Sequence, residues 1–351
     1  MIDLLWLLLP VAVLSGWLTA YYQKQQQSAD LLSPDYFKGL NYLLNEEPDK
    51  AIDIFIKLVE VGGDTVETHF ALASFFRRRG EFNRAIRLHK NLSLYSEKRK
   101  LALFELGLDY RHAGLLDKAE HFFQKLLSSD THHTLALRQL LEIYQEVQDW
   151  EGAINIAQQL EKASNEPMHT IIAQYYCEQG QEKAALKIDP NCVRATLLEA
   201  QMALDQGKQL QAISAFQRVE QQNPAYLSEI IAPLQTCYQA IGKPEEFTRY
   251  LQLLLERHPG ITPMLANLNL DKFIITKIEK QPPSLRGLKL QLDLTLSKTD
   301  NLEDLLLLKD MITELLKNKP VYQCNQCGLT AKMLYWQCPA CQQWNTLKPI
   351  P

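Results

Sequence analysis

Small, aromatic and apolar residues recur every 34 positions through the first half of the chain. The positions that keep step are Ala51, Ala85, Ala119 and Ala153, then Tyr42, Phe76, Tyr110 and Tyr144, and finally Gly39, Ala73, Gly107 and Leu141. Gly80 and Gly114 fall between the two halves of a period, where glycine marks a turn. Each period therefore predicts two helices joined by a turn.

The residue types at the recurring positions explain how such helices would pack. In the stretch ELGLDYRHAGLLDKAEHFFQKLL, the small residues Gly107 and Ala119 allow the paired helices to approach closely, and Tyr110 and Phe123 fill the space that remains. One pair cannot bury its apolar face alone, so successive pairs stack into a superhelix. This is the tetratricopeptide pattern, and it predicts an all-α repeat array over residues 35–319.

The period slips after Ala153. The next matching alanine, Ala212, follows 59 residues later, whereas two full periods need 68. The segment IIAQYYCEQGQEKAALKIDP predicts one full helix and only about two turns of a second. We therefore expect one shortened repeat near residues 170–190, with a local defect or bend, before the pattern resumes and then weakens beyond Pro259.

The first 22 residues have a different character. No charged residue occurs from Leu4 to Tyr22, a length close to the roughly twenty residues that span a bilayer. Trp6 and Trp17 lie near the ends of this run, where aromatic rings favour the membrane interface. A cleavable signal peptide would need a basic start, and a buried core helix is the other alternative. We expect a transmembrane anchor over residues 1–22 and a polar linker over 23–34.

Four cysteines close the chain with the spacing C-x2-C-x10-C-x2-C. Two C-x-x-C turns can direct four sulfurs at one point and complete a tetrahedral shell. We predict a small metal-binding module over residues 320–351, covered by Tyr335, Trp336 and Trp344. Structural zinc is the preferred ion and iron the alternative; two disulfides are the competing interpretation. The predicted ligands are Cys324, Cys327, Cys338 and Cys341.

The other three cysteines, Cys177, Cys192 and Cys237, stand alone in helical sequence and are expected to be buried apolar residues. A four-thiolate site is safest in a reducing compartment, so we expect the bulk of the chain to face the cytoplasm.

Charge and motifs exclude several classes of function. The chain has 37 Lys+Arg and 41 Asp+Glu, a net charge of -4, which does not support nucleic-acid binding. None of the phosphate-binding, nucleophile-elbow or zinc-protease signatures occurs, so we do not expect an enzyme. One basic cluster is either a solvated, salt-bridged face or a docking patch for an acidic or polar partner; it contains Arg77, Arg78, Arg79, Arg84 and Arg87.

Three segments together resemble the lipopolysaccharide assembly protein B family. They are LLPVAVLSGW, FRRRGEFNRAIRLHKNL and the terminal KPVYQCNQCGLTAKMLYWQCPACQQWNTLKP. The resemblance implies a single-pass protein of the Gram-negative inner membrane whose terminal module is rubredoxin-like and packs against the repeats. Members of that family also tend to self-associate into homo-oligomers, and the residues leave the oligomeric state of this chain open.

The resemblance further implies a role as an adaptor. Members of that family promote degradation of the lipid A pathway deacetylase by the membrane-bound AAA protease, and an inner-membrane lipopolysaccharide sensor protein restrains them. Two alternatives remain open from the residues: a scaffold for lipopolysaccharide assembly and transport enzymes that directs no proteolysis, and an electron-transfer protein with an iron centre.

Overall fold

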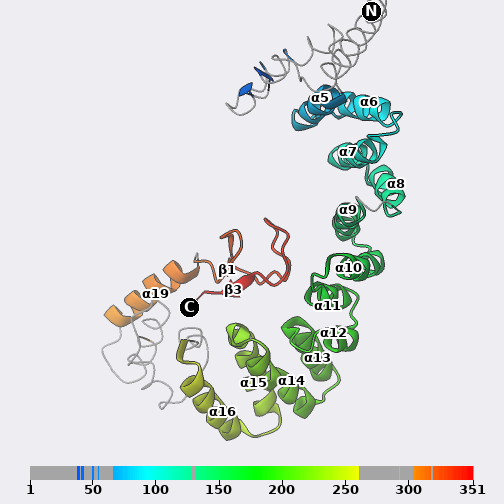
Figure 1. Cartoon of the computed structure of the whole chain (residues 1–351). Coiled ribbons are helices and arrows are strands. Elements are labelled where there is room, and N and C mark those ends of the chain that lie inside the picture. Colours follow the sequence, from blue (N-terminus) through cyan, green and yellow to red (C-terminus); the bar gives the residue numbers. More distant parts are fainter. Residues whose placement is uncertain are drawn as a thin grey trace, which may run out of the picture. The chain divides into compact units, whose positions relative to one another are not determined.

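The computed structural model describes residues 66–128, 132–260, 303–317 and 319–350, together with the isolated positions 38, 39, 41, 42, 50, 54 and 292. It divides into two compact units, Met1–Ile143 and Tyr144–Pro351 (Figure 1). The predicted anchor (1–22) and linker (23–34) lie outside the described residues. Within the described part of the chain, no helix combines the length and the apolar character needed to cross a bilayer.

In the first unit, the helices pair as the 34-residue period predicts. Both turns contain a glycine in the left-handed region, Gly80 with φ +76° and Gly114 with φ +73°, where a side chain would be strained. The first unit contains α5 (Val66–Arg78), α6 (Phe82–Leu92), α7 (Arg99–His112) and α8 (Leu116–Leu126), and α9 (His133–Glu146) continues into the second unit.

The predicted packing positions form the contact between α7 and α8. Ala119 and Phe123 are completely buried. Gly107 lies against the Phe123 ring so closely that a Cβ atom there would be 2.6 Å from Cε1 of the ring. Position 107 therefore requires a glycine because the Phe123 ring faces it from the partner helix. Tyr110 stacks on Phe122, with the ring centroids 5.4 Å apart.

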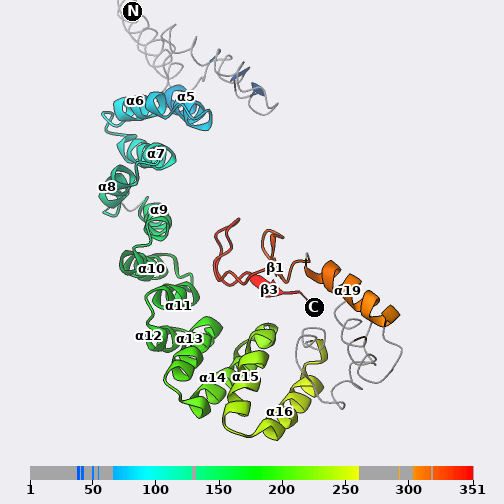
Figure 2. The ribbon, with the colours of Figure 1, turned by 180° about the vertical axis from the view of Figure 1, so that it is seen from behind.

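The second unit continues with helix pairs, seen from behind in Figure 2. Where the sequence period slips, α12 has seven residues. The helices are α10 (Trp150–Ser164), α11 (His169–Glu178), α12 (Glu182–Ile188), α13 (Val193–Asp205), α14 (Gln209–Gln222), the 3-10 helix η1 (Pro224–Tyr226), α15 (Leu227–Ala240), α16 (Pro244–Arg257) and α19 (Glu303–Lys317). One apolar core runs through α13 to α16 and includes the buried Phe216, Leu234 and Leu251.

A small sheet follows α19 at the end of the chain. It has three antiparallel strands in the order β2-β1-β3: β1 (Tyr322–Cys324), β2 (Thr330–Ala331) and β3 (Leu347–Pro349). Tyr322 pairs with Ala331 on one side and with Pro349 on the other. The described chain is therefore mostly helical, with its strands confined to the terminal module.

Candidate metal centre

The two C-x-x-C segments form matching turns. In the first, the Gly328 N–H donates to the Cys324 carbonyl at 2.9 Å; in the second, the Gln342 N–H donates to the Cys338 carbonyl at 2.8 Å. Gly328 and Gln342 both adopt left-handed backbone conformations, with φ of +76° and +56°. Local backbone bonding thus presents each cysteine pair in the same way, and both pairs face one point.

The four sulfur atoms have the spacing of a tetrahedral metal site. Sγ of Cys324 lies 3.7 Å from Sγ of Cys341, and Sγ of Cys327 lies 3.6 Å from Sγ of Cys338. All four sulfurs lie within 4.8 Å of one another. An ion with four sulfur bonds of about 2.3 Å sets its ligands about 3.8 Å apart, so these residues fit such an ion.

Electrostatics within the cluster also favour a cation. Burial opposes ionisation of Cys324, but hydrogen bonds from Thr346 and from the amides of Cys327 and Gln326 outweigh it and lower the pKa of Cys324 to about 6. The Leu329 amide favours the thiolate of Cys327, yet burial and the neighbouring thiols raise the pKa of Cys327 to about 12. Four thiolates cannot share this space without a positive ion among them.

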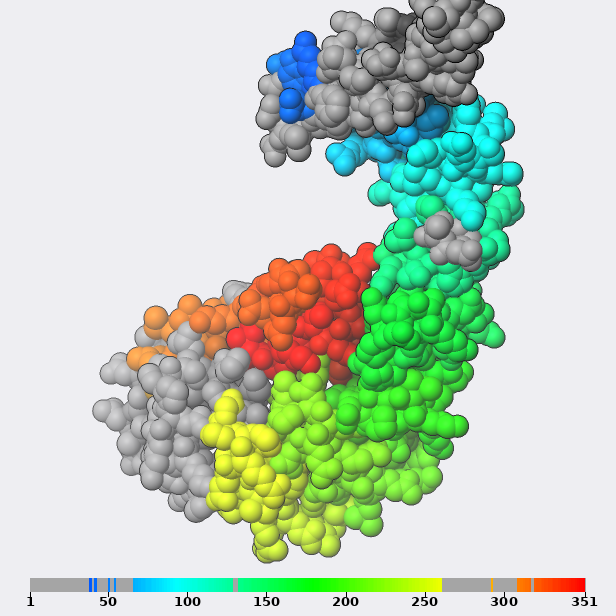
Figure 3. All heavy atoms as spheres, in the orientation of Figure 1, coloured from blue at the N-terminus to red at the C-terminus, as the bar shows by residue number. Residues whose placement is uncertain are grey.

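Trp344 attaches the module to the helix pairs of the second unit. Its indole Nε1 donates to Oε1 of Gln145 at 3.2 Å. Its ring meets Trp150 and Tyr175 edge to face, with centroids 6.3 and 5.9 Å apart, and the Arg194 guanidinium lies 6.0 Å from it. Figure 3 shows the module's red atoms against the green atoms of these helices.

A second group of contacts surrounds Tyr226, at the end of η1. Its hydroxyl donates to the Leu347 carbonyl at 3.1 Å and accepts from Nζ of Lys348 at 2.8 Å. The same Nζ lies 4.1 Å from the centre of the Tyr226 ring, and Trp336 packs on that ring at 5.3 Å. Burial lowers the pKa of Lys348. The expectation that the module packs against the repeats is confirmed within this unit.

The sequence predicted only part of the module surface that contacts the helices, and it predicted none of the helical residues in that contact. Trp336 and Trp344 pack against residues of the helices, Tyr226 for Trp336 and Trp150 and Tyr175 for Trp344, and Tyr335 is 42 % exposed. No sequence pattern marked Gln145 and Tyr226 as contact residues, because they lie 199 and 122 positions along the chain from their partners Trp344 and Lys348. Only the three-dimensional structure brings such residues together.

The basic cluster contains two kinds of arginine. Arg77 is only 15 % exposed, and its guanidinium pairs with Glu105 at 2.6 Å and with Asp109 at 2.8 Å. Asp109 is completely buried and also contacts Nδ1 of His89 at 2.5 Å. Arg77 therefore belongs to a buried network that joins α5, α6 and α7.

The other arginines of the cluster are exposed: Arg78, Arg79, Arg84 and Arg87. Glu81 pairs with Arg79 at 3.4 Å and with Arg84 at 2.8 Å. Arg87 donates to its own helix, at the carbonyl of Asn83. Part of the predicted cluster is thus a solvated, salt-bridged face on α6 and the end of α5.

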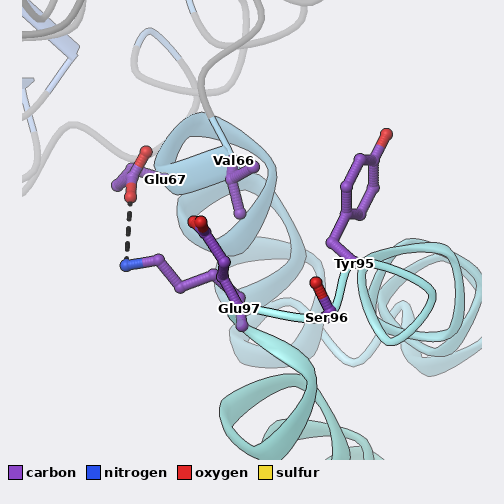
Figure 4. Close-up of a pocket in the computed structure, with 6 residues that line it drawn as sticks. Val66, Glu67, Tyr95, Ser96 and Glu97 are labelled. Carbon is purple, nitrogen blue, oxygen red and sulfur yellow. Dashed lines mark ion pairs between the residues drawn. The ribbon is translucent and has the colours of Figure 1, made fainter.

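A hollow of about 360 Å³ lies where α5 begins (Figure 4). An ion pair of 3.4 Å between Glu67 and Lys98 crosses it. All of its lining side chains are exposed or half-buried, so it holds no buried polar group that would fix a ligand. Its lining residues are Val66, Glu67, Tyr95, Ser96, Glu97 and Lys98.

Comparison with known proteins agrees with this architecture. A family model described as "Rubredoxin metal binding domain" matches residues 322–349, and tetratricopeptide repeat models match residues 68–101 and 140–226. "Lipopolysaccharide assembly protein B" of Escherichia coli (strain K12) is 36% identical over 383 residues, covering 100% of this chain and 98% of the relative. The chain belongs to the lipopolysaccharide assembly protein B family.

A second member of the family, from Haemophilus influenzae, is 32% identical and covers 100% of this chain and 98% of its own length. The predicted family, its tetratricopeptide repeats and its rubredoxin-like module are therefore confirmed. Among solved structures, "Crystal structure of MamA" is 19% identical over 50% of this chain and 99% of that chain, with a TM-score of 0.39.

Proposed function

We propose that this protein is an inner-membrane adaptor that regulates lipopolysaccharide synthesis. In this role it promotes degradation of the lipid A pathway deacetylase by the membrane-bound AAA protease, under restraint by an inner-membrane lipopolysaccharide sensor protein. The observation that supports the proposal is similarity over the full length to relatives named for lipopolysaccharide assembly, with both repeats and metal module retained.

The proposed ion is a single structural zinc held by the four cysteine thiolates. Four protein sulfurs leave no open coordination position, and a closed site stabilises a fold rather than binding a substrate. The module has only three short strands and a small apolar cluster, so it needs such a link to stay folded. Iron in the same sulfur shell is the alternative, and it would give the protein a visible absorption band.

The proposed adaptor has no catalytic role of its own. Stacked helix pairs supply an extended surface for protein partners. An anchor over residues 1–22, with the repeats on the cytoplasmic side, would confine adaptor, protease and deacetylase to one membrane surface. Confinement of this kind raises their effective concentration without any additional contact.

The exposed arginines are the proposed docking patch for a partner. They lie on one short stretch of α5 and α6, where an acidic or polar partner surface can find several guanidinium groups at once. Arg77 supports this patch from inside, since its ion pairs with Glu105 and Asp109 fix the end of α5. Self-association into homo-oligomers belongs to the same proposal.

Depletion tests the adaptor role most directly. When the protein is depleted, the deacetylase should accumulate. Its half-life, measured after protein synthesis is blocked, should increase. A level and half-life that stay constant while the envelope-assembly complexes disperse would instead favour a scaffold that directs no proteolysis.

Metal analysis with a visible spectrum separates zinc from iron: a colourless protein with one zinc per chain is expected, and a red protein with a reversible one-electron couple would overturn the structural-zinc proposal.

A further inference from the structure

Two cysteines that the sequence places in separate helices lie together in the second unit. Sγ of Cys177, near the end of α11, is 3.9 Å from Sγ of Cys192, which immediately precedes α13. Both side chains are buried, and the short helix α12 lies between them in the chain. We propose that Cys192 is a peroxide-sensitive modification site and that Cys177 converts its oxidised form into an intramolecular disulfide.

The surroundings of Cys192 stabilise a thiolate. Cys192 is the N-cap residue of α13, where the helix dipole and free backbone amides favour negative charge. The Gln174 side chain donates from Nε2 to the Cys192 sulfur at 3.3 Å. A hydrogen bond from the Cys177 thiol, and a further one from the Ala195 amide, lower the pKa of Cys192 against the opposing effect of burial and of Asp189.

The two sulfurs therefore have unequal roles. The hydrogen-bonded contact with Cys192, together with burial, raises the pKa of Cys177, whereas the pKa of Cys192 is lowered, so Cys192 is the more readily ionised of the two. Gln174 is 1 % exposed, and its Oε1 has no hydrogen-bond partner among the described residues. This oxygen offers an acceptor beside the sulfur for the hydroxyl of a sulfenic acid.

A cavity gives a small oxidant access to Cys192. The cavity has a volume of about 310 Å³ and lies between the helix pairs and the terminal module. Cys192 lines it, with His169, Asp189, Gln222 and Lys348 among its other lining residues, whereas Cys177 does not. Hydrogen peroxide is small enough to enter, so the first oxidation falls on Cys192 and the buried neighbour reacts second.

The chemistry balances with hydrogen peroxide as the oxidant. The Cys192 thiolate attacks one peroxide oxygen, the O–O bond breaks, and hydroxide leaves as the sulfenic acid forms. The Cys177 sulfur then attacks the Cys192 sulfur, an S–S bond forms, and the hydroxyl leaves with the Cys177 proton as water. In total, two thiols and one hydrogen peroxide give one disulfide and two waters.

The disulfide would form beside the contacts that hold the metal module. Arg194 pairs with Glu178 at 2.8 Å, and these two residues lie within two positions of Cys192 and Cys177. Arg194 and Tyr175 both contact the Trp344 ring. Closing the sulfurs from 3.9 Å to the roughly 2.05 Å of a disulfide draws together α11 and the start of α13, two of the elements that contact Trp344. Oxidation is therefore expected to change the environment of that indole.

Peptide mapping of the full-length, metal-loaded protein in detergent tests the proposal. The protein is treated with equimolar hydrogen peroxide, its free thiols are alkylated, and linked peptides are identified by mass spectrometry. We expect a peptide pair joined through Cys177 and Cys192, with the ion still bound. Before oxidation, iodoacetamide should modify Cys192 at least about tenfold faster than Cys237, which is completely buried in α15 and whose pKa is raised by burial.

Three variants separate the roles. Cys177→Ala should accumulate a Cys192 sulfenic acid that dimedone traps, and Cys192→Ala should abolish both the linked peptide and the trapped product. Cys237→Ala is the matched control and should form the same disulfide as the unchanged protein. The proposal is overturned if peroxide releases the metal ion before the pair is linked, or if the folded, unsubstituted protein yields no linked peptide.

Discussion

At the scale of single residues, the buried carboxylate of Asp109 is the most demanding feature of the first unit. It is completely buried on α7, and it contacts Arg77 of α5 and His89 of α6. Removing a charge from water costs several kcal/mol, which only well-placed partners offset. The network therefore specifies how three helices meet, and its members depend on one another.

Replacing that carboxylate should be costly. Asp109→Asn keeps the shape but removes the completely buried charge that pairs with the Arg77 guanidinium and leaves it only the partly exposed Glu105, so we expect a loss of about 3 kcal/mol in the free energy of unfolding. Urea titration followed by circular dichroism measures it. The control is Arg87→Ala on the exposed face, expected to change stability by less than about 0.5 kcal/mol. If both substitutions lowered the free energy of unfolding equally, the buried network would contribute no more to stability than an exposed arginine does.

Two glycines lack a side chain for different physical reasons, steric crowding at Gly107 and backbone conformation at Gly328. Gly107→Ala puts a methyl group 2.6 Å from the Phe123 ring, and we expect overpacking to cost about 1–3 kcal/mol despite the gain in helix propensity. Gly328→Ala meets no atom within 4 Å, yet its φ of +76° should cost about 1 kcal/mol. Thermal unfolding measures both. Phe123→Leu should partly rescue the first substitution and leave the second unchanged; rescue of both would refute this distinction.

At the scale of elements, one aromatic side chain of the terminal module contacts three helices, α9, α10 and α11, beside the separate contacts around Tyr226. Trp344 reaches the end of α9 through Gln145 and packs on α10 and α11 through Trp150 and Tyr175. Its attachment combines one hydrogen bond with the ring contacts of a half-buried indole. The two contributions can be separated because phenylalanine keeps most of the ring and loses the indole N–H.

Truncating this side chain should loosen the module on α9 to α11, where the contacts around Tyr226 remain, without emptying its metal site. Trp344→Ala is expected to cost about 3–5 kcal/mol of attachment, and Trp344→Phe only about 1 kcal/mol. Hydrogen exchange of residues 320–350 should rise strongly in the first variant and slightly in the second, with one ion per chain retained in both. If Trp344→Ala lost its ion, the attachment and the metal site would be one cooperative structure instead.

At the scale of the whole molecule, sequence patterns predicted what is local and periodic. The 34-residue series places Ala85, Ala119 and Ala153 in completely buried positions, and the cysteine spacing places four sulfurs around one point. Contacts between distant segments left no such pattern. The pairing of Cys177 with Cys192 depends on the length of α12, and the inward turn of Arg77 depends on a carboxylate one repeat away.

Metal removal joins these scales in one experiment. Cys324→Ser with Cys327→Ser removes two of four ligands and leaves the other pair too few to close a tetrahedral shell. Because structural metal binding is coupled to folding, we expect the module to unfold and the helices that contact it to lose protection from hydrogen exchange. If the proposed adaptor role holds, the deacetylase should then persist in cells, as we expect after depletion, whereas Cys237→Ser should leave its turnover unchanged. A module that stays folded without its ion, or normal deacetylase turnover in the double variant, would mean that the four sulfurs do not support the function proposed for them.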